Sequence, residues 1–305
     1  MGNQLFQYAA GRRLAHIHNT SLKLELSQYS LDLFRRFGLC AFNHSAKIAN
    51  VLDLLFLFPL EAFRSICSYV LNDRFSTIFL KKLDNKIHYL ANRLDYIDQK
   101  TNSEPLLLSK VASQRYYHFD PEVLDLPDNT YLMGYWQNEK YFADIENILR
   151  HDLTFKHKLN AKNKKIAFQI NNSNSVSIHI RRGDLLNIDN IVILDLEYYI
   201  SCIEYIAAEI NDPNFFVFSD DINWAKNNLK SKFNIIYLEN NSPSEDLHLM
   251  SLCKHNIIAN SSFSWWGAWL NKNSDKIVLV SKSIPWVFYD NFNPDDLYPK
   301  NWIKI

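Results

Sequence analysis

The chain has 305 residues, of which 47% are hydrophobic and 14% aromatic, so it can bury the cores of about two domains. Its 33 Lys and Arg residues balance its 33 Asp and Glu residues. This balance argues against a nucleic-acid-binding protein, which needs a broad basic surface, and any anion must be bound by a local cluster of residues.

The first predicted element is a helix. Apolar residues at helical spacing run from Leu5 to Leu14, directly after Gly2-Asn3, and the alternation from Leu22 to Leu26 predicts a strand. A glycine turn that opens a helix normally follows a strand in nucleotide-binding α/β units, and here no strand precedes it. We therefore expect a first lobe that lacks its first strand, with reduced stability or activity. Residues 1–15 are too polar for a secretory signal, which indicates a cytoplasmic protein.

Residues 27–110 carry few parallel-strand signals and predict a helix-rich insertion. Their most apolar stretch, Ile48 to Leu60, is interrupted by Asp53 and Pro59. It is shorter than the roughly 20 apolar residues of a membrane span. This stretch indicates a core or interface helix and leaves peripheral contact with a membrane surface open.

The middle of the chain predicts a strand at 130–133 and a helix that ends near Leu149. Residues 156–174 are rich in Lys and Asn with little apolar periodicity, and predict a linker. From residue 175 onward, short apolar strands alternate with amphipathic helices, which predicts βαβ units and a parallel sheet. The strands are expected at 175–180, 215–219, 234–238, 256–259 and 276–280, and the helices at 195–210, 222–230, 244–254 and 262–271.

Arg181 and Arg182 directly follow the first of these strands. In an open α/β sheet the carboxyl ends of the strands are where ligands bind. Two guanidinium groups beside a sheet core need an anion to neutralise them, and a diphosphate suits their planar donors. The alternative is a solvated basic pair on the surface. Asp184 is a candidate general base or a residue that orients Arg182, and His179 is a candidate ligand or a core histidine.

Two further strand ends carry polar residues at the same expected edge. Ser261 and Ser262 open a helix, whose free amides favour a phosphate, although Ser261 alone could be an ordinary cap. Asp220 is assigned to a ribose or base, and Asp221 to capping the next helix.

Several common catalytic and metal-binding patterns are missing from the sequence. No Asp-x-Asp, HExxH or EF-hand spacing is present, so no metal is expected, and without a P-loop or a GxSxG elbow neither a P-loop ATPase nor an α/β-hydrolase is expected. The four cysteines form no CxxC pair, which favours buried free thiols in a reducing compartment. They are Cys40, Cys67, Cys202 and Cys253.

The motifs together resemble the bacterial α-1,2-fucosyltransferases of glycosyltransferase family 11. The similarity extends nearly to the C-terminus and is carried by Gly2-Asn3-Gln-Leu-Phe-Gln-Tyr-Ala9, His179-Ile-Arg-Arg-Gly-Asp184, Phe218-Ser-Asp-Asp221 and the run from Asp246 to Trp269 with its Ser-Ser-Phe-Ser-Trp-Trp segment. The resemblance implies a GT-B architecture, with two Rossmann-like lobes facing across a cleft. Residues 1–155 would form the acceptor-side lobe, 156–174 the linker region, and 175–305 the GDP-fucose-binding lobe.

The resemblance also implies an activity. L-Fucose would pass from GDP-β-L-fucose to the 2-hydroxyl of a terminal galactoside, with inversion and without a metal, in surface polysaccharide synthesis at the cytoplasmic face of the inner membrane. The alternatives are a fucosyltransferase of another linkage or acceptor, and an inactive GDP-sugar-binding scaffold.

The residue roles follow from the same resemblance. Arg181 would hold the β-phosphate and assist its departure, and Arg182 would be a second phosphate or structural contact. Asn3 would approach the glycosidic oxygen from the opposite lobe, and Asp184 is the nearest candidate base. The remaining donor contacts would be His179 and Asp220 to the nucleoside, and Ser261, Ser262 and Phe263 to the phosphates and base region.

Overall fold

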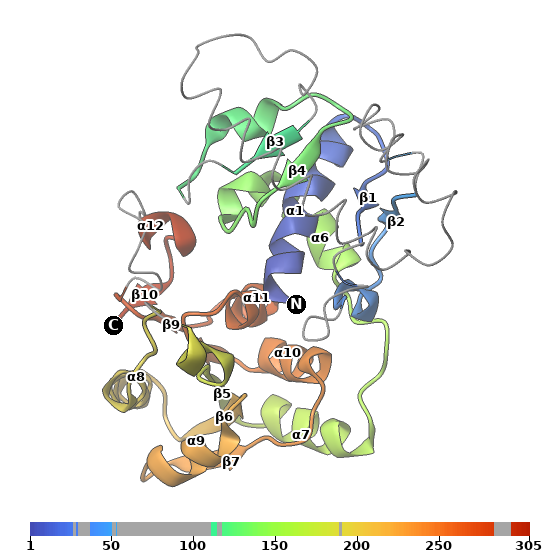
Figure 1. Ribbon diagram of the computed structural model, residues 1–305. Helices are drawn as coiled ribbons and strands as arrows, with labels where there is room; N and C mark the ends of the chain where they lie inside the picture. Colours follow the sequence, from blue (N-terminus) through green and yellow to red (C-terminus); the bar gives the residue numbers. More distant parts are fainter. Residues whose placement is uncertain are drawn as a thin grey trace. The chain divides into compact units, whose positions relative to one another are not determined.

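A computed structural model describes residues 1–26, 29, 37–50, 53, 111–114, 118–188, 191–283 and 294–305 (Figure 1). The chain divides into two units. Unit 1 contains Met1–Leu5, Gln137–Glu139 and Thr154–Ile305, and unit 2 contains Phe6–Trp136 and Lys140–Leu153. Most of the expected insertion at 27–110, including nearly all of the apolar stretch, lies outside the described residues.

Unit 1 is built on a six-stranded parallel sheet. Its strand order is β10-β9-β8-β5-β6-β7, and every neighbouring pair is parallel. The chain moves outward from β5 through β6 to β7, then returns to β8 on the other side of β5. This is the strand order of dinucleotide-binding Rossmann sheets, in which ligands bind where the order reverses, here between β5 and β8. The strands are β5 (Asn174–Ile180), β6 (Pro213–Ser219), β7 (Asn234–Tyr237), β8 (His255–Ile257), β9 (Val278–Val280) and β10 (Ile303–Lys304).

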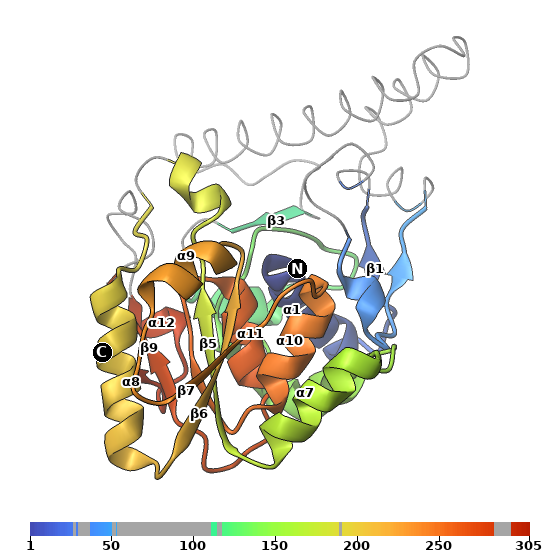
Figure 2. The ribbon, with the colours of Figure 1, turned by 90° about the horizontal axis from the view of Figure 1, so that it is seen from below.

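Helices cover both faces of this sheet (Figure 2). α8 and α9 pack on one face through a buried apolar cluster, and on the other face α10 contacts both α7 and α11. Because alternate strand residues face opposite sides, β5 sends Val176 and Ile178 into the cluster under α8 and turns His179 toward Phe263 of α11. The helices are α7 (Ala161–Asn171), α8 (Leu196–Glu209), α9 (Ile222–Asn228), α10 (Pro243–Leu252), α11 (Ser262–Leu270) and α12 (Pro294–Leu297).

The segment expected as a linker, 156–174, instead contains α7. The Asn160 side chain caps this helix by accepting a hydrogen bond from the backbone of Asn163, and Ala167 and Ile170 are buried. The apolar face of this helix is narrow, and most of its other residues are Lys and Asn. The apolar residues therefore show no clear helical periodicity in the sequence.

Unit 2 contains two parallel strand pairs and most of the long first helix, α1 (Gly2–Ile17), from Phe6 onward. β1 (Lys23–Leu24) pairs with β2 (Lys47–Ile48), and β3 (Val111–Ser113) pairs with β4 (Tyr131–Met133). Within this unit Tyr8 and Arg12 of α1 both donate to Asp152 at the end of α6 (Glu146–Asp152), at 2.6 and 2.9 Å.

The expected α/β class is confirmed, and both units contain parallel strands, as a GT-B architecture requires. Within the described ranges, every helix falls short of the length and apolar character needed to cross a membrane. The short 3-10 helices are η1 (Leu39–Ala41), η2 (Pro121–Asp125), η3 (Glu139–Tyr141), η4 (Ala143–Ile145) and η5 (Asp184–Asn187).

The first turn of α10 carries two carboxyl groups whose pKa values shift in opposite directions. Ser242 and Glu245 form a capping box, and the hydrogen bond from the Ser242 backbone lowers the pKa of Glu245. Burial raises the pKa of the neighbouring Asp246 to about 6, from an ordinary value of 3.8.

Asp246→Asn is expected to stabilise the protein at pH 8 and to change little at pH 4. A carboxyl whose pKa rises on folding weakens the fold as the pH passes from 3.8 through about 6, because ionising it while buried is unfavourable. The gain at pH 8 should be roughly 2 kcal/mol in the free energy of unfolding, measured by urea denaturation. Glu245→Gln is the matched control and should lower stability at pH 8. An equal gain for Asp246→Asn at both pH values would contradict the assignment.

Candidate functional site

Arg181 leaves the end of β5 and is held between two carboxylates. Its Nη1 donates to Asp220 Oδ2 at 2.5 Å, and its Nη2 lies 2.5 Å from Asp184 Oδ1. The Arg181 side chain is 32% exposed. Since a guanidinium has five N–H donors, these two contacts fix its plane and leave donors for an anion.

Asp220 shapes the turn that carries both arginines. One of its carboxylate oxygens takes the Arg181 bond, and the other accepts from the backbone N–H of Arg182 at 2.9 Å. Gly183 permits this approach because it has no side chain. A Cβ at this position would lie only 2.7 Å from Asp220 Oδ2 and would clash with it. Both oxygens of Asp220 therefore already bind the arginine turn, and its expected contact with a nucleoside stays a prediction.

Asp184 was expected to orient Arg182. Its carboxylate instead pairs with Arg181. The i,i+3 spacing within the turn brings its carboxylate to the first arginine. The Asp184 side chain is 64% exposed, so it is accessible from solvent at the same turn.

Arg182 lies against an aromatic ring. Its guanidinium carbon is 4.1 Å from the centre of the Trp224 ring, and its Nε is 3.6 Å from Asp221 Oδ2. Asp221 also caps α9 by accepting from the backbone N–H of Trp224 at 3.1 Å, which confirms its expected role. The first turn of α9 thus supplies both a ring and a carboxylate to position Arg182.

A nucleoside diphosphate such as GDP is the probe for the diphosphate expected at the arginine pair. Trp224→Ala should weaken its affinity about tenfold, while Trp224→Phe retains most of it. A desolvated cation–π contact contributes about 1–2 kcal/mol, and its loss frees the Arg182 side chain to move. Calorimetric titration with GDP measures the effect, and melting curves check that both variants fold. Wild-type affinity in the Ala variant would show that the ring does not position Arg182 for the nucleotide.

His179 is buried beneath the start of α11, with its ring centre 5.4 Å from that of Phe263. Burial, reinforced by the positive charge of Arg181, lowers its pKa to about 3. The imidazole is therefore neutral near pH 7. Its Nδ1 is buried and has no hydrogen-bond partner among the described residues, so a bound ligand could supply one.

The N-terminus of α11 meets the N-terminus of α1. Ser261 caps α11 by accepting from the backbone N–H of Phe263, as one of the two sequence interpretations expected. Ser262 Oγ donates to Asn3 Oδ1 at 2.5 Å. Gly2 lies so close that an added Cβ would be 2.5 Å from the backbone nitrogen of Phe263.

Asn3 stands in the first turn of α1, where the chain passes from one unit to the other. Met1–Leu5 group with unit 1, the unit that contains Arg181 and α11, whereas the rest of α1 belongs to unit 2. Asn3 accepts hydrogen bonds from Ser262 and from Gln137 Nε2, the latter at 2.9 Å, and its expected approach to the donor from the opposite lobe stays a prediction. All nine expected site residues therefore belong to one unit, around the carboxyl ends of its central strands.

Gln137 and Trp224 lie at the site without a signal in the sequence that identifies them. Gln137 stands in the run from Gly134 to Phe142, which carries no signal for a contact with the N-terminus. Trp224 is three residues beyond Asp221, a spacing that could have placed it at the helix cap but not against Arg182.

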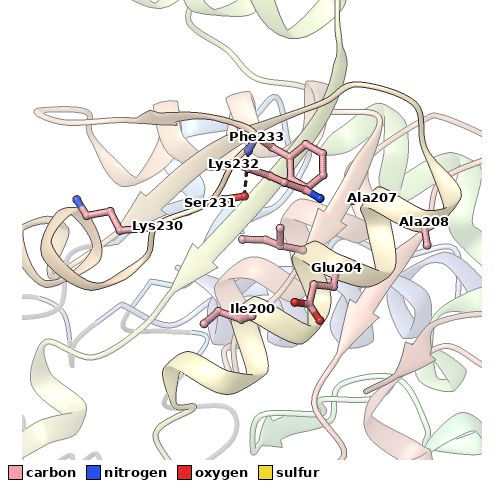
Figure 3. A pocket seen from close by; sticks show the side chains of 9 residues that line it. Ile200, Glu204, Ala207, Ala208, Lys230, Ser231, Lys232 and Phe233 are labelled. Atoms are coloured by element: carbon pink, nitrogen blue, oxygen red, sulfur yellow. Dashed lines mark hydrogen bonds between the residues drawn. The ribbon is translucent and has the colours of Figure 1, made fainter.

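The structure also contains an open groove that none of these residues lines (Figure 3). It has a volume of about 520 Å³ and lies between α8 and the loop before β7. Its lining residues include Ile200, Glu204, Lys230 and Phe233. In the part of the chain that the structure describes, no group of three His, Cys, Asp or Glu residues is placed to hold a metal ion.

The cysteines in the described part of the chain are free thiols. Cys202 and Cys253 are buried as expected, whereas Cys40 is exposed. Cys67 lies outside the described residues.

Comparisons with known proteins find relatives of named activity. The family model of Glycosyl transferase family 11 matches residues 85–305. An alpha-1,2-colitosyltransferase of Escherichia coli is 33% identical over 100% of this chain and 96% of its own length. The O-antigen biosynthesis glycosyltransferase WbnK of Escherichia coli is also 33% identical, over 100% and 97%. Galactoside alpha-(1,2)-fucosyltransferase 2 of Sus scrofa is 28% identical over 44% and 42%.

Among solved structures, the fucosyltransferase NodZ from Bradyrhizobium superposes with a TM-score of 0.44 at 11% identity, covering 87% of this chain and 88% of NodZ.

Proposed function

The chain belongs to glycosyltransferase family 11, and we propose that it transfers L-fucose from GDP-β-L-fucose to the 2-hydroxyl of a terminal galactoside, with inversion and without a metal. The α-1,2 linkage in the names of its relatives supports the position of transfer. The Rossmann strand order of unit 1 supports a nucleotide-linked donor.

The observation that carries this proposal is the arrangement of Arg181 between Asp184 and Asp220, in the unit that also holds the N-terminus of α11. When the sugar leaves GDP, negative charge develops on the β-phosphate. A guanidinium that two carboxylates already hold in place can stabilise this charge without reorganising, and the amides of a helix N-terminus add to it. Arginine can thereby neutralise the departing diphosphate in place of a metal ion.

In the proposed reaction the acceptor oxygen bonds to the anomeric carbon on the face opposite the diphosphate. The bond from that carbon to the phosphate oxygen breaks, and its electron pair leaves with GDP. The acceptor 2-hydroxyl loses its proton as the new bond forms. Asp184 is the candidate base from the sequence, but its ion pair with Arg181 places its carboxylate beside the group that holds the diphosphate, so the proton acceptor on the opposite face stays unassigned.

A colitose donor is the second candidate for the sugar. The specific observation in its favour is the colitosyltransferase that is 33% identical over the whole chain. Colitose is L-fucose without its 3-hydroxyl, so the same phosphate contacts serve both donors. The choice depends on side chains that face that hydroxyl.

The experiment is to measure GDP release from GDP-fucose and from GDP-colitose, each with lactose or N-acetyllactosamine, in the presence of EDTA. Acceptor-dependent release with fucose, and an α-1,2 product by NMR, is the expected result. A large preference for GDP-colitose would replace the donor, and loss of activity in EDTA would overturn metal independence. GDP binding without transfer to any galactoside would favour a binding scaffold.

We further propose that the acceptor belongs to a surface polysaccharide and that the enzyme works at the cytoplasmic face of the inner membrane. The O-antigen role in the name of a full-length relative supports the acceptor class.

A further inference from the structure

The side-chain oxygen of Asn3 accepts two hydrogen bonds. Ser262 Oγ donates to it at 2.5 Å and Gln137 Nε2 at 2.9 Å. These residues lie 259 and 134 positions away in the chain, and all three belong to unit 1. Two distant segments therefore converge on one atom of the first helical turn.

Two donors on its oxygen set the orientation of the Asn3 amide. An asparagine side chain has one acceptor oxygen and one NH₂ group with two donors, and either can occupy the same position if the amide rotates by half a turn. The 2.5 Å contact with Ser262 Oγ fits an O–H···O bond and is too short for a bond from an amide nitrogen, so the oxygen of Asn3 faces Ser262. Gln137 then presents its Nε2 group, which can only donate, to the same oxygen. The Asn3 Nδ2 group then points away from Gln137 and Ser262.

The backbone before Gln137 supplies a second, independent observation. Trp136 has a φ of 55°, in the left-handed region that a bulky residue rarely adopts, and its side chain is fully buried. Such conformations cluster at functional sites, where the surrounding structure holds them. The kink at Trp136 determines the direction in which the next residue, Gln137, leaves the backbone.

We propose that Gln137 is a positioning residue that turns the Asn3 amide so that its Nδ2 group donates to the oxygen between the sugar and the β-phosphate. This inference rests on the proposed function. Asn3 touches the nucleotide sugar, and Gln137 acts through Asn3. Two neutral N–H donors suit this site, because they stabilise the growing charge on the leaving oxygen and add no further cation beside Arg181.

Replacing Gln137 with Glu and with Met tests the orientation. Methionine fills a similar volume without a donor, and Gln137→Met should lower kcat about tenfold with little change in the KM for the acceptor. Glutamate is an acceptor when ionised, so Gln137→Glu should lower kcat by about thirtyfold or more at pH 8. Its activity relative to wild type should recover as the pH falls toward 5.5, because the carboxylic acid can again donate. Gln169→Glu, exposed on α7, is the control for the added charge.

A double-mutant cycle with Asn3→Ala separates positioning from a general structural role. In the Asn3→Ala background, Gln137→Met should change kcat less than twofold, because the group it positions is gone. Independent, multiplying losses would overturn the proposal. So would full activity of Gln137→Glu at pH 8, which would mean that the Asn3 amide faces the other way.

The same cycle is run on the affinity for GDP, measured by calorimetry, because GDP retains the β-phosphate oxygens. We expect Gln137→Met to weaken GDP binding severalfold in the wild-type background and not in Asn3→Ala. A wild-type enzyme that transfers no fucose would refute the proposed function, and the GDP cycle would still decide the role of Gln137.

Discussion

Replacing Arg181 with lysine is expected to lower kcat for fucose transfer roughly 10³-fold, although the positive charge is kept. The guanidinium of Arg181 contacts Asp220 through one nitrogen and Asp184 through another, and the proposal requires it to hold a phosphate as well. A lysine ammonium is a compact charge that cannot span these partners with fixed geometry. Arg181→Ala should also weaken GDP binding, because Asp184 and Asp220 would then face the phosphate unneutralised.

The control for Arg181→Lys is Arg150→Lys. Arg150 donates to Glu146 one turn away on α6, and a pair of this kind contributes little. Transfer rates and GDP affinities of the two variants are compared after their melting temperatures are shown to be similar. If Arg181→Lys retains activity within about fivefold of Arg150→Lys, the proposed role of Arg181 in the departure of GDP is wrong.

The nucleotide lobe could be predicted from sequence because buried parallel strands have an unmistakable pattern. Runs such as Phe215–Phe218 and Ile257–Ala259 are apolar on both faces, as expected for strands covered by helices on each side. Once the alternation of strands and helices is recognised, topology alone brings Arg181, Asp220 and Ser261 to one edge. The structure confirms each of these strands to within a few residues.

The finer contacts could not be predicted, because they depend on where side chains meet in space. Gln137 and Asn3 are 134 residues apart, and no local sequence pattern predicts their contact. Nor does any pattern predict that Asp184 pairs with Arg181 instead of Arg182. The helix α7 was missed for a different reason. Its stability comes from packing and a cap at Asn160, which the excess of Lys and Asn conceals.

The close approach of two helix ends leads to the second large prediction. Gly2→Ala is expected to lower the transfer rate at least about 100-fold, since a displacement of about 1 Å at a catalytic group has this effect. An added Cβ would meet the backbone of Ser262 and Phe263, which cannot move aside as a side chain can. The first turn of α1 must then shift and carry Asn3 away from Ser262.

Gly11→Ala in the same helix is the matched control for this substitution. Its Cβ would lie 2.8 Å from the Cδ1 atom of Leu22, the end of a flexible side chain that can rotate away. Alanine is the better helix former by about 1 kcal/mol, so both substitutions should otherwise favour α1. Transfer rates and melting curves of the two variants therefore isolate the steric effect at Gly2. A Gly2→Ala rate within about threefold of that of Gly11→Ala would mean that the contact between α1 and α11 does not position Asn3 for catalysis.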